Sequence, residues 1–424
     1  MTSRLRVLFF LCFFAAKTMI ALKGKYRIPA LAATSFLLML SCGITELGGE
    51  DGFRSDGAAG QLPGEPPAES AAPCYVLGVD YPSGYDWVAD REKGSVKCSL
   101  VVFVDGIPKM KIPSGDLYEV STDPDMARII DGHLYTDFST DSETVIKKDG
   151  KELFRYAGRE FMCGMSVVGD TLYTLGQSRD GTGFSFRRNG EVVVGRSAGY
   201  LFGRLQKTEG RHVFAFCEPI LSADGSLERY YLVIDGKVSQ IAVREDVEKV
   251  WDVVYHCGEV CIIAALTGIP APVIMRGNGL AMLDVPASQV HSCRLLPAGT
   301  VLYADILMSV QGNQLKNGIW KGMFMHQTFD SGLTVSAVCA DGETLSCVLN
   351  PSDVRGKGVI YRCGDLCDMP SGYVSMGSRT AGMSGGILHV GLSSSSCGKP
   401  ALWRDGELHH LDFNGYISSV TFLQ

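Results

Sequence analysis

The cysteines are the residues whose number and spacing could do chemistry. The chain has fourteen, and two pairs, Cys257 with Cys261 and Cys363 with Cys367, each flank a glycine-containing turn. Each pair could face across a hairpin within disulfide reach, or could remain as buried free thiols. A zinc ion would need all four sulfurs in one tetrahedron. The two cysteine pairs lie about 100 residues apart, in units of a sequence repeat (described below) that are not neighbours. The spacing therefore predicts no metal site.

The eight histidines show no arrangement typical of catalysis. His409 and His410 are adjacent on an expected strand, so they point to opposite faces and cannot chelate one metal together. His410 and Asp412 share a face, but a solvated outer strand accounts for them, and His389 is expected to serve in packing. The sequence has no recognisable Ser/His/Asp set, P-loop or dinucleotide fingerprint. It therefore predicts neither catalytic residues nor a cofactor.

The composition indicates which elements must position these residues. Glycine accounts for 50 of the 424 residues, hydrophobic residues for 46% and charged residues for only 20%. Such a chain is too apolar for disorder and too rich in glycine for a helical bundle, so the composition favours an all-β protein with many turns. A single β-barrel or β-propeller can hold this length in one core.

The first 41 residues have the features of an export signal. They contain six cations and no acids. Three basic residues precede the 13-residue apolar run 28–40, which is too short to span ~30 Å of hydrocarbon as a helix. Translation from Met19 would give a signal of ordinary proportions, and the alternative is a long N-terminal region before the apolar run. Residues 1–41 are therefore expected to form a cleaved leader.

Met39-Leu40-Ser41-Cys42 resembles the lipobox of bacterial lipoproteins, with Met39 in place of the more usual leucine. The resemblance implies a diacylglycerol on the Cys42 thiol and a cleavage that leaves Cys42 as the acylated N-terminus. Two or three acyl chains bind a membrane far more strongly than one chain does. An ordinary signal or a buried core segment is the alternative.

Residues 42–73 are expected to be the acylated cysteine and a flexible tether. The 31 residues after Cys42 include seven glycines, four prolines and six acids against one arginine. They have almost no apolar content to bury, and as a coil they would span roughly 30 Å.

The charge of the remaining chain argues against nucleic acid as a partner. Without the leader, 33 cations stand against 46 acids, a net charge of 33 − 46 = −13. Such a surface repels phosphate backbones, and no basic cluster is visible along the sequence.

From Cys74 onward the sequence repeats with a period of about 43 residues. Each unit has an apolar run that ends in a tight turn, usually Asp-Gly or Asn-Gly, because both turn positions must tolerate positive φ. The turn glycines are Gly106, Gly150, Gly190, Gly236, Gly279 (or Gly277), Gly322, Gly364 and Gly406. A second glycine turn lies 18 to 26 residues earlier in seven units. Each unit is therefore expected to contain four strands.

Four short strands per unit and circular closure are typical of a β-propeller. Residues 74–424 accommodate eight blades, or seven if one match is accidental. The unmatched strand Tyr416–Phe422 is expected to pair with the strand at Cys74, to be buried on both sides and to close the ring.

Three aromatic residues, Trp320, Tyr361 and Trp403, stand at equivalent places before their turns. This regularity indicates core packing between blades, although aromatic residues in some propellers bind sugars.

The leader, the tether and the repeat together resemble the envelope lipoproteins of Bacteroidetes that carry a β-propeller of unknown function. The resemblance implies an outer-membrane location, on its periplasmic or its outer face. A non-catalytic binding or scaffolding module for a glycan, a peptide or a protein is the first hypothesis, because no catalytic set is visible. A hydrolase or lyase acting on polysaccharide is the second, since loops of different blades could assemble a site. Two carboxylates ~5–10 Å apart at the channel mouth would favour hydrolysis.

Overall fold

The residues that the computed structural model describes all belong to one compact unit, Glu65–Gln424. They are residues 72–87, 98–114, 127–140, 142–178, 180–208, 210–222, 225–310, 314–352, 356–362, 364–396 and 398–422. The expected leader, Cys42 and nearly all of the tether lie outside them. Within these ranges, no helix has the length and the apolar character needed to cross a membrane.

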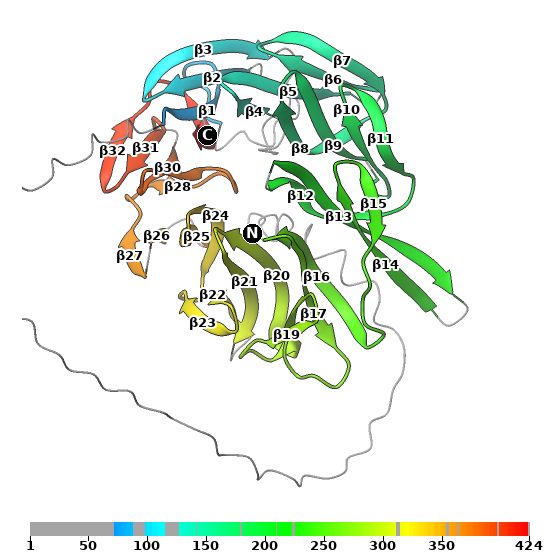
Figure 1. The fold of residues 1–424 in the computed structure, drawn as a ribbon. Coiled ribbons are helices and arrows are strands. Elements are labelled where there is room, and N and C mark those ends of the chain that lie inside the picture. The colour runs from blue at the N-terminus through cyan, green and yellow to red at the C-terminus, as the bar shows by residue number, and fades with distance from the viewer. Residues whose placement is uncertain are drawn as a thin grey trace, which may run out of the picture. The chain divides into compact units, whose positions relative to one another are not determined.

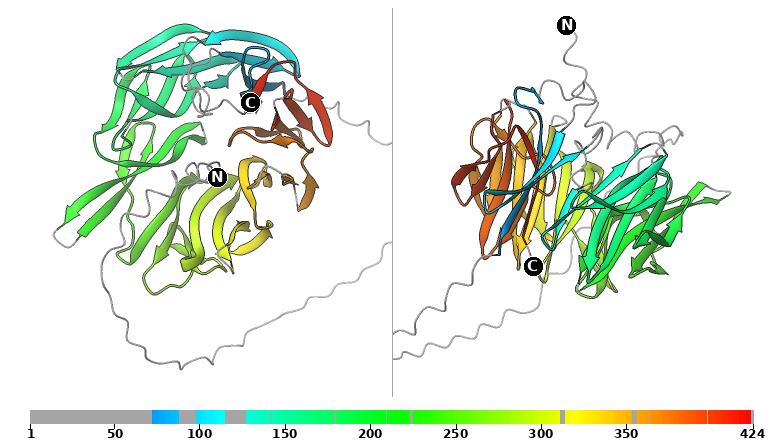
Figure 2. Two further views of the ribbon diagram at one scale, coloured as in Figure 1. Left: turned by 180° about the vertical axis from the view of Figure 1, so that it is seen from behind. Right: turned by 90° about the horizontal axis from the view of Figure 1, so that it is seen from above.

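The unit is an eight-bladed β-propeller, so the predicted fold class is confirmed and the seven-blade alternative is wrong (Figure 1). Each blade is an antiparallel sheet, and consecutive blades follow one another around the ring (Figure 2). Blade 1 is built from β33 with β1 to β3, and blades 2 to 8 then follow in chain order. Within a blade the strands run in sequence from the channel to the rim.

The strands divide into four classes by their position in the blade. The innermost are β33 (Gly415–Phe422), β4 (Ala127–Ile130), β8 (Glu160–Val168), β12 (Tyr200–Thr208), β16 (Val247–His256), β20 (Val290–Ala298), β24 (Leu333–Asp341) and, in blade 8, β28 (Tyr373–Val374) with β29 (Ala381–Ser384). The second strands are β1 (Cys74–Asp80), β5 (His133–Ser139), β9 (Thr171–Ser178), β13 (Arg211–Ser222), β17 (Glu259–Leu266), β21 (Val301–Val310), β25 (Thr344–Pro351) and β30 (Ile387–Ser394).

The outer half of each blade is a short hairpin. Its third strands are β2 (Cys98–Val104), β6 (Glu143–Lys148), β10 (Phe184–Arg188), β14 (Gly225–Ile234), β18 (Val273–Arg276), β22 (Gln314–Lys321), β26 (Val359–Arg362) and β31 (Ala401–Arg404). Its rim strands are β3 (Ile107–Ser114), β7 (Lys151–Ala157), β11 (Glu191–Arg196), β15 (Lys237–Gln240), β19 (Gly279–Met282), β23 (Phe324–Thr328), β27 (Asp365–Asp368) and β32 (Glu407–His410). A 3-10 turn, η2 (Ala287–Gln289), precedes β20.

The outer hairpin turns explain the repeated Asp-Gly and Asn-Gly pairs. In five blades the Asp or Asn has a positive φ between 42° and 51°, and the glycine after it is also left-handed. In blade 2, the Asp149 amide donates to the Leu134 carbonyl (2.7 Å) and Asp149 Oδ1 accepts from the Leu134 amide (2.9 Å). The same two-point contact recurs in blades 1, 3, 4 and 8. The Asp or Asn therefore adopts the backbone conformation that the turn requires and also makes two hydrogen bonds to one residue of the second strand.

The outer turns of blades 5, 6 and 7 lack this dipeptide. In blade 6 the Gly322 amide donates to the Leu302 carbonyl (3.2 Å), but glycine has no side-chain oxygen that could accept a second hydrogen bond from the Leu302 amide. In blade 5 Arg276 pairs with Gly279, so the turn residues are Gly277 and Asn278. Gly279 is therefore a strand residue, and the glycine anchor of this unit is Gly277.

The last strand closes the ring as predicted. β33 pairs antiparallel with β1, with Val420 opposite Val76 and Tyr416 opposite Val79, and its residues 415–420 are buried. Ile417 packs against Gly391 of β30, where a Cβ would come within 2.4 Å of Ile417 Cγ2. β33 thus joins blade 1 through strand pairing. It joins blade 8 through packing and through hydrogen bonds from the Ile417 amide to Ser393 Oγ (3.1 Å) and from the Val420 amide to the Arg379 carbonyl (2.8 Å).

The three regularly placed aromatic residues lie in the core, which confirms the packing interpretation and rules out sugar binding by these side chains. Trp320 and Tyr361 are 1% exposed and Trp403 is also buried. Each belongs to a cluster that contains residues of two adjacent blades. Trp320 also donates its indole N–H to Asp284.

Candidate binding site

Of the two alternatives for Cys257 and Cys261, a disulfide or free thiols, the structure has free thiols. Cys257 is an exposed residue of the turn between β16 and β17, whereas Cys261 is buried in β17 opposite Val254. Burial raises the pKa of Cys261 to about 11, so this thiol stays protonated at neutral pH. Cys363 lies outside the described residues, and its pairing with Cys367 stays a prediction.

The histidines occupy the places that the sequence indicated. His409 and His410 are exposed on the rim strand β32, and His389 is buried against the Phe422 ring at a centroid distance of 4.9 Å. Among the described residues, no group of three or more His, Cys, Asp or Glu side chains could hold a metal ion.

A cleft of about 550 Å³ lies where the two ends of the propeller domain meet, and we call it the closure cleft. Tyr81, Lys111, Lys399, Asp80 and Asp412 are among the side chains that line it. The chain segments around it are joined by the Tyr81 amide, which donates to the Asn414 carbonyl (2.7 Å). Asn414 Nδ2 in turn donates to the Pro82 carbonyl (2.8 Å). The cleft therefore exists only because the ring is closed.

Both aspartates of the closure cleft are paired with lysines. Lys111 Nζ lies 2.7 Å from Asp80 Oδ2, and the Asn414 amide donates to Asp80 Oδ1 (3.0 Å). Lys399 Nζ lies 2.8 Å from Asp412 Oδ1, and these side chains are 61% and 91% exposed. The hydrogen bond from Lys399 lowers the pKa of Asp412. Asp412 is thus a poor proton donor at neutral pH, although it can accept hydrogen bonds from a ligand.

A second cavity, of about 300 Å³, lies in the channel, and we call it the channel cavity. Residues of blades 1, 2, 3, 7 and 8 line it: Arg128, Ile129, Ile130, Met165, Val338, Ser378, Arg379, Ala381, Ser419, Val420 and Thr421. The charged members of this described lining are two arginines. Arg128 on β4 donates from Nη1 to the Met165 carbonyl of β8 (2.8 Å), which ties its side chain to the next blade.

The innermost strand of blade 8 is interrupted beside this cavity. Residues 375–380 separate β28 from β29 and carry Ser378 and Arg379. Asn350 of β25 holds the segment through the Ser375 amide (2.9 Å) and the Ser375 carbonyl (2.6 Å). Thr380 is fully buried and donates to the Gly377 carbonyl (2.8 Å). The segment is therefore a built part of the channel wall.

A third arginine reaches the same segment from the far side of the ring. Arg204 Nη1 lies 3.0 Å from Ser378 Oγ, a contact between blades 4 and 8, which are opposite one another in a ring of eight. β12 and β28 face each other across the channel in Figure 1. Arg204 stands in an irregular part of β12, after the left-handed Gly203 (φ 62°) and before the pairing with β13 resumes at Gln206. This arginine cluster was not identified from the sequence. A single arginine within an otherwise apolar inner strand could have indicated it.

A buried ion pair lies within blade 3, beside a tyrosine of blade 2. Arg187 of β10 contacts Glu160 of β8 through both terminal nitrogens (2.5 and 2.8 Å), and the pair is largely shielded from solvent. The guanidinium also lies 3.8 Å from the centroid of the Tyr156 ring of β7. Burial raises the pKa of Tyr156. This group lines neither of the two cavities and serves packing between blades.

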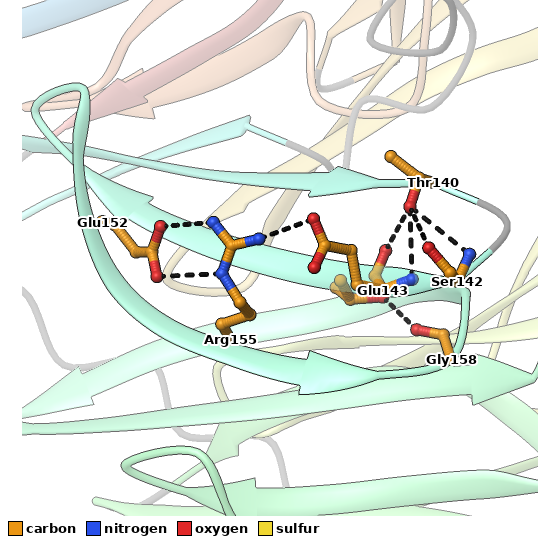
Figure 3. A network of polar contacts seen from close by, with 7 residues as sticks. Thr140, Ser142, Glu143, Glu152, Arg155 and Gly158 are labelled. Atoms are coloured by element: carbon orange, nitrogen blue, oxygen red, sulfur yellow. Dashed lines mark hydrogen bonds and ion pairs between the residues drawn. The ribbon is translucent and has the colours of Figure 1, made fainter.

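A surface network on blade 2 is likewise structural. Figure 3 shows Arg155 between two carboxylates, with Nη2 2.7 Å from Glu152 and Nη1 2.6 Å from Glu143. The hydrogen bond from Arg155 lowers the pKa of Glu152. Beside it, Thr140 Oγ1 accepts from the Glu143 amide (3.2 Å) and shapes the turn before β6. These contacts tie β6 to β7 on an exposed surface.

No protein-family model and no curated protein matches the sequence. Among solved structures, the β-propeller domain of the Trilobed protease from Pyrococcus furiosus, described as having an open velcro topology, aligns at 11% identity. That alignment has a TM-score of 0.41 and covers 64% of this chain and 86% of the other. Pyrococcus horikoshii acylaminoacyl peptidase aligns at 10% identity with a TM-score of 0.42, over 71% of this chain and 52% of the peptidase. Kluyveromyces lactis Hsv2 aligns at 10% identity and a TM-score of 0.38, over 72% and 96%. These similarities concern the propeller fold alone.

Proposed function

We propose that this protein is a lipid-anchored, non-catalytic binding module of the bacterial outer membrane. Acylation of Cys42 holds the chain at the membrane, residues 43–73 act as the tether, and the propeller binds a polar glycan, a peptide or a protein segment. The lipobox-like leader supports the anchor, and the geometry of the closure cleft supports the binding role.

The closure cleft is the observation that carries the binding role. It offers the Tyr81 ring, two ammonium groups and two carboxylates within about 550 Å³. The Lys399–Asp412 pair is exposed, so a ligand can replace either partner at little cost. Mixed charges beside an aromatic ring match the polar groups and flat faces of sugars and of polar peptides.

The presence of two carboxylates in one cleft favours polysaccharide hydrolysis as the second candidate. That reaction needs one carboxyl group that stays protonated near neutral pH to act as the acid. Lys399 shifts the pKa of Asp412 in the opposite direction. Asp80 accepts from the Asn414 amide and so holds the closing segments together. Binding is therefore the better supported function.

Binding and turnover of defined polysaccharides by the full chain in detergent micelles test the proposal. A glycan array identifies ligands, and the affinity of the best one is compared between wild type, Lys111→Gln and Asp412→Asn. We expect both variants to bind about tenfold more weakly, the loss of one charge-assisted hydrogen bond. Lys151→Gln, an exposed rim position on β7, is the matched control and should bind as wild type does.

Release of reducing ends from the same polysaccharides separates the two candidates. Turnover that disappears in Asp412→Asn while affinity persists would replace the binding module with a hydrolase. Equal affinity in all three variants would remove the closure cleft as the binding surface.

A further inference from the structure

We infer that the rim strand β19 of blade 5 is a docking site for an extended peptide segment of another protein, which adds to the blade as a fifth strand. The segment that fits carries apolar side chains on one face and at least one carboxylate on the other. Blade 5 lies opposite blade 1 in the ring of eight, so this site is separate from the closure cleft and goes beyond the proposed function.

The edge of β19 is open and unprotected. β19 is the last strand of its sheet, at the rim of the ring, and among the described strands it pairs with β18 alone (Figure 1). Its four residues, Gly-Leu-Ala-Met, include no charged residue and no proline, the residue types that protect strand edges from further pairing. Leu280 and Met282 are 42% and 52% exposed. The edge is therefore available to another strand.

The backbone groups that face this open edge belong to Leu280 and Met282. The Leu283 amide, just beyond the strand, donates to the Pro272 carbonyl (2.9 Å), and the pairing of β18 with β19 has no register shift. In an antiparallel pair, every second residue bonds to the partner strand and the residues between them point away. The amides and carbonyls of Leu280 and Met282 thus point away from β18, where an added strand can bond to them.

Two clefts lie beside β19, one toward blade 4 and one toward blade 6. Their volumes are about 550 and 530 Å³, and Gly279 and Leu280 line both. The side chains of a strand alternate between its two faces, so a strand added to β19 directs them alternately toward the two clefts. Backbone pairing then supplies affinity, and the clefts supply selectivity for the side chains.

The cleft toward blade 4 suits apolar side chains. Met275, which lies opposite Leu280, packs with residues of blades 4 and 5. The charged lining residues of this cleft are already paired, Arg244 with Asp246 at 2.8 Å and Glu259 with Arg276 at 2.6 Å. Its apolar lining residues include Ile241, Val260, Ile262 and Met275.

The cleft toward blade 6 suits a carboxylate. Its described lining contains Arg276 and Lys321 and no acidic residue. Arg276 is balanced by Glu259, which is not part of this lining. Lys321 is exposed at the end of β22, and its ammonium lies 5.9 Å from the centroid of the Tyr303 ring. Lys321 therefore gives this face a positive charge that a glutamate or aspartate of the added strand can balance.

A labelled peptide, fluorescein-Ser-Val-Glu-Leu-Glu-Val-Ser-amide, tests the inference when its fluorescence anisotropy is followed during titration with the full chain in detergent micelles. We expect saturable binding that weakens by at least about tenfold when both glutamates are replaced by lysine. Only alternate amides of an added strand face β19. Methylation of the amide nitrogen of the central leucine or of the glutamate after it should therefore have unequal effects, at least about tenfold for one and less than about threefold for the other.

Two proline variants form a matched pair. Leu280→Pro removes an outward amide of β19 and keeps the bonds to β18, so it should weaken peptide binding by at least about tenfold. Leu366 is the second residue of the rim strand β27 and is 52% exposed. Its amide also points outward, because the Met369 amide donates to the Gly358 carbonyl (2.8 Å). Leu366→Pro should therefore bind the peptide as wild type does.

A second pair of variants tests the charge. Lys321→Gln should reduce the preference for the glutamate peptide over the lysine peptide by about threefold, the size expected for an exposed ion pair. Lys151→Gln, at an exposed rim position on β7, should leave this preference unchanged.

Several results would overturn the inference. They are absence of binding by wild type at about 1 mM peptide, equal effects of the two methylations, and equal effects of Leu280→Pro and Leu366→Pro at unchanged unfolding temperatures. The methylation test uses wild-type protein, so it remains decisive if Leu280→Pro does not fold. A dimer that Leu280→Pro alone converts to a monomer would assign the edge to a second copy of the chain. Loss of binding in Asp412→Asn, with normal binding by Leu280→Pro, would move the peptide to the closure cleft.

Discussion

Truncation of Ile417 to alanine should destabilise the whole propeller, because β33 is the strand that closes the ring. Ile417 is fully buried, with 0% exposure, and packs with Val76 and Val101 of blade 1 and against Gly391 of blade 8. Large-to-small changes at such positions cost about 2–5 kcal/mol in the free energy of unfolding. Typical net stabilities are about 5–15 kcal/mol, so one side chain carries a substantial share.

The matched control is Ile107→Ala in β3, the rim strand of the same blade. Ile107 is 69% exposed, so its truncation should change the free energy of unfolding by less than about 0.5 kcal/mol. Urea unfolding followed by circular dichroism measures both variants, with the midpoint as the readout. Equal midpoints for the two variants would refute the assignment of β33 as the closing strand.

Deletion of residues 415–424 applies the same reasoning to the whole strand. It removes the buried side chains of Tyr416, Ile417 and Val420, at about 1.5–3 kcal/mol each, together with the hydrogen bonds to β1. It also exposes the edge of β1 to pairing with other chains. We expect aggregation or unfolding, whereas deletion of residues 43–73 should leave the unfolding temperature unchanged. A monomeric 415–424 deletion with the wild-type unfolding temperature would contradict the closure.

Four other changes have defined outcomes. Cys42→Ala should leave an unprocessed precursor that incorporates no labelled palmitate, and normal processing and labelling would disprove acylation at this residue. Asp149→Gly keeps the left-handed turn but removes the Oδ1 acceptor, so it should lower the urea midpoint by the equivalent of about 1 kcal/mol. Arg187→Met should destabilise by about 3–5 kcal/mol because it leaves the Glu160 carboxylate buried without its partner, and adding Glu160→Met should recover most of that loss. Burial lowers the pKa of His212 in the folded protein, so the unfolded chain binds a proton more readily than the folded chain does. The free energy of unfolding should therefore fall as the pH decreases below about 6.5. In His212→Gln this decrease should be less steep.

Local chemistry explains which parts of the fold were predictable. A two-residue hairpin turn requires positive φ at both positions, so the Asp-Gly and Asn-Gly pairs marked the outer hairpins directly. Their spacing gave the length of a blade and hence the number of blades. The C-terminal strand belonged to no repeat unit of its own, and the first unit lacked one strand. Pairing beside the strand at Cys74 therefore followed from the count, and the structure has this pairing. In blade 5 the sequence left Gly279 and Gly277 open, because the turn there, Gly277-Asn278, reverses the usual order of residue types.

The candidate sites depend on distances that the repeat does not encode. The spacing of Cys257 and Cys261 left a disulfide and free thiols open, because the strand register, which places Cys261 opposite Val254, is set by the packing of the whole blade. The closure cleft needs both ends of the propeller domain in contact, and neither end alone contains it.

The sequence by itself determined the turns, the strand count and the closure, because each follows from residues that are near neighbours or from a repeat of fixed length. Only the tertiary structure brought Arg128, Arg204 and Arg379 together. They belong to blades 2, 4 and 8, and an irregular stretch of β12 and an interrupted strand in blade 8 position two of them. Their convergence follows from the geometry of a closed ring, in which the innermost strands of all blades share one axis whatever their separation in the chain.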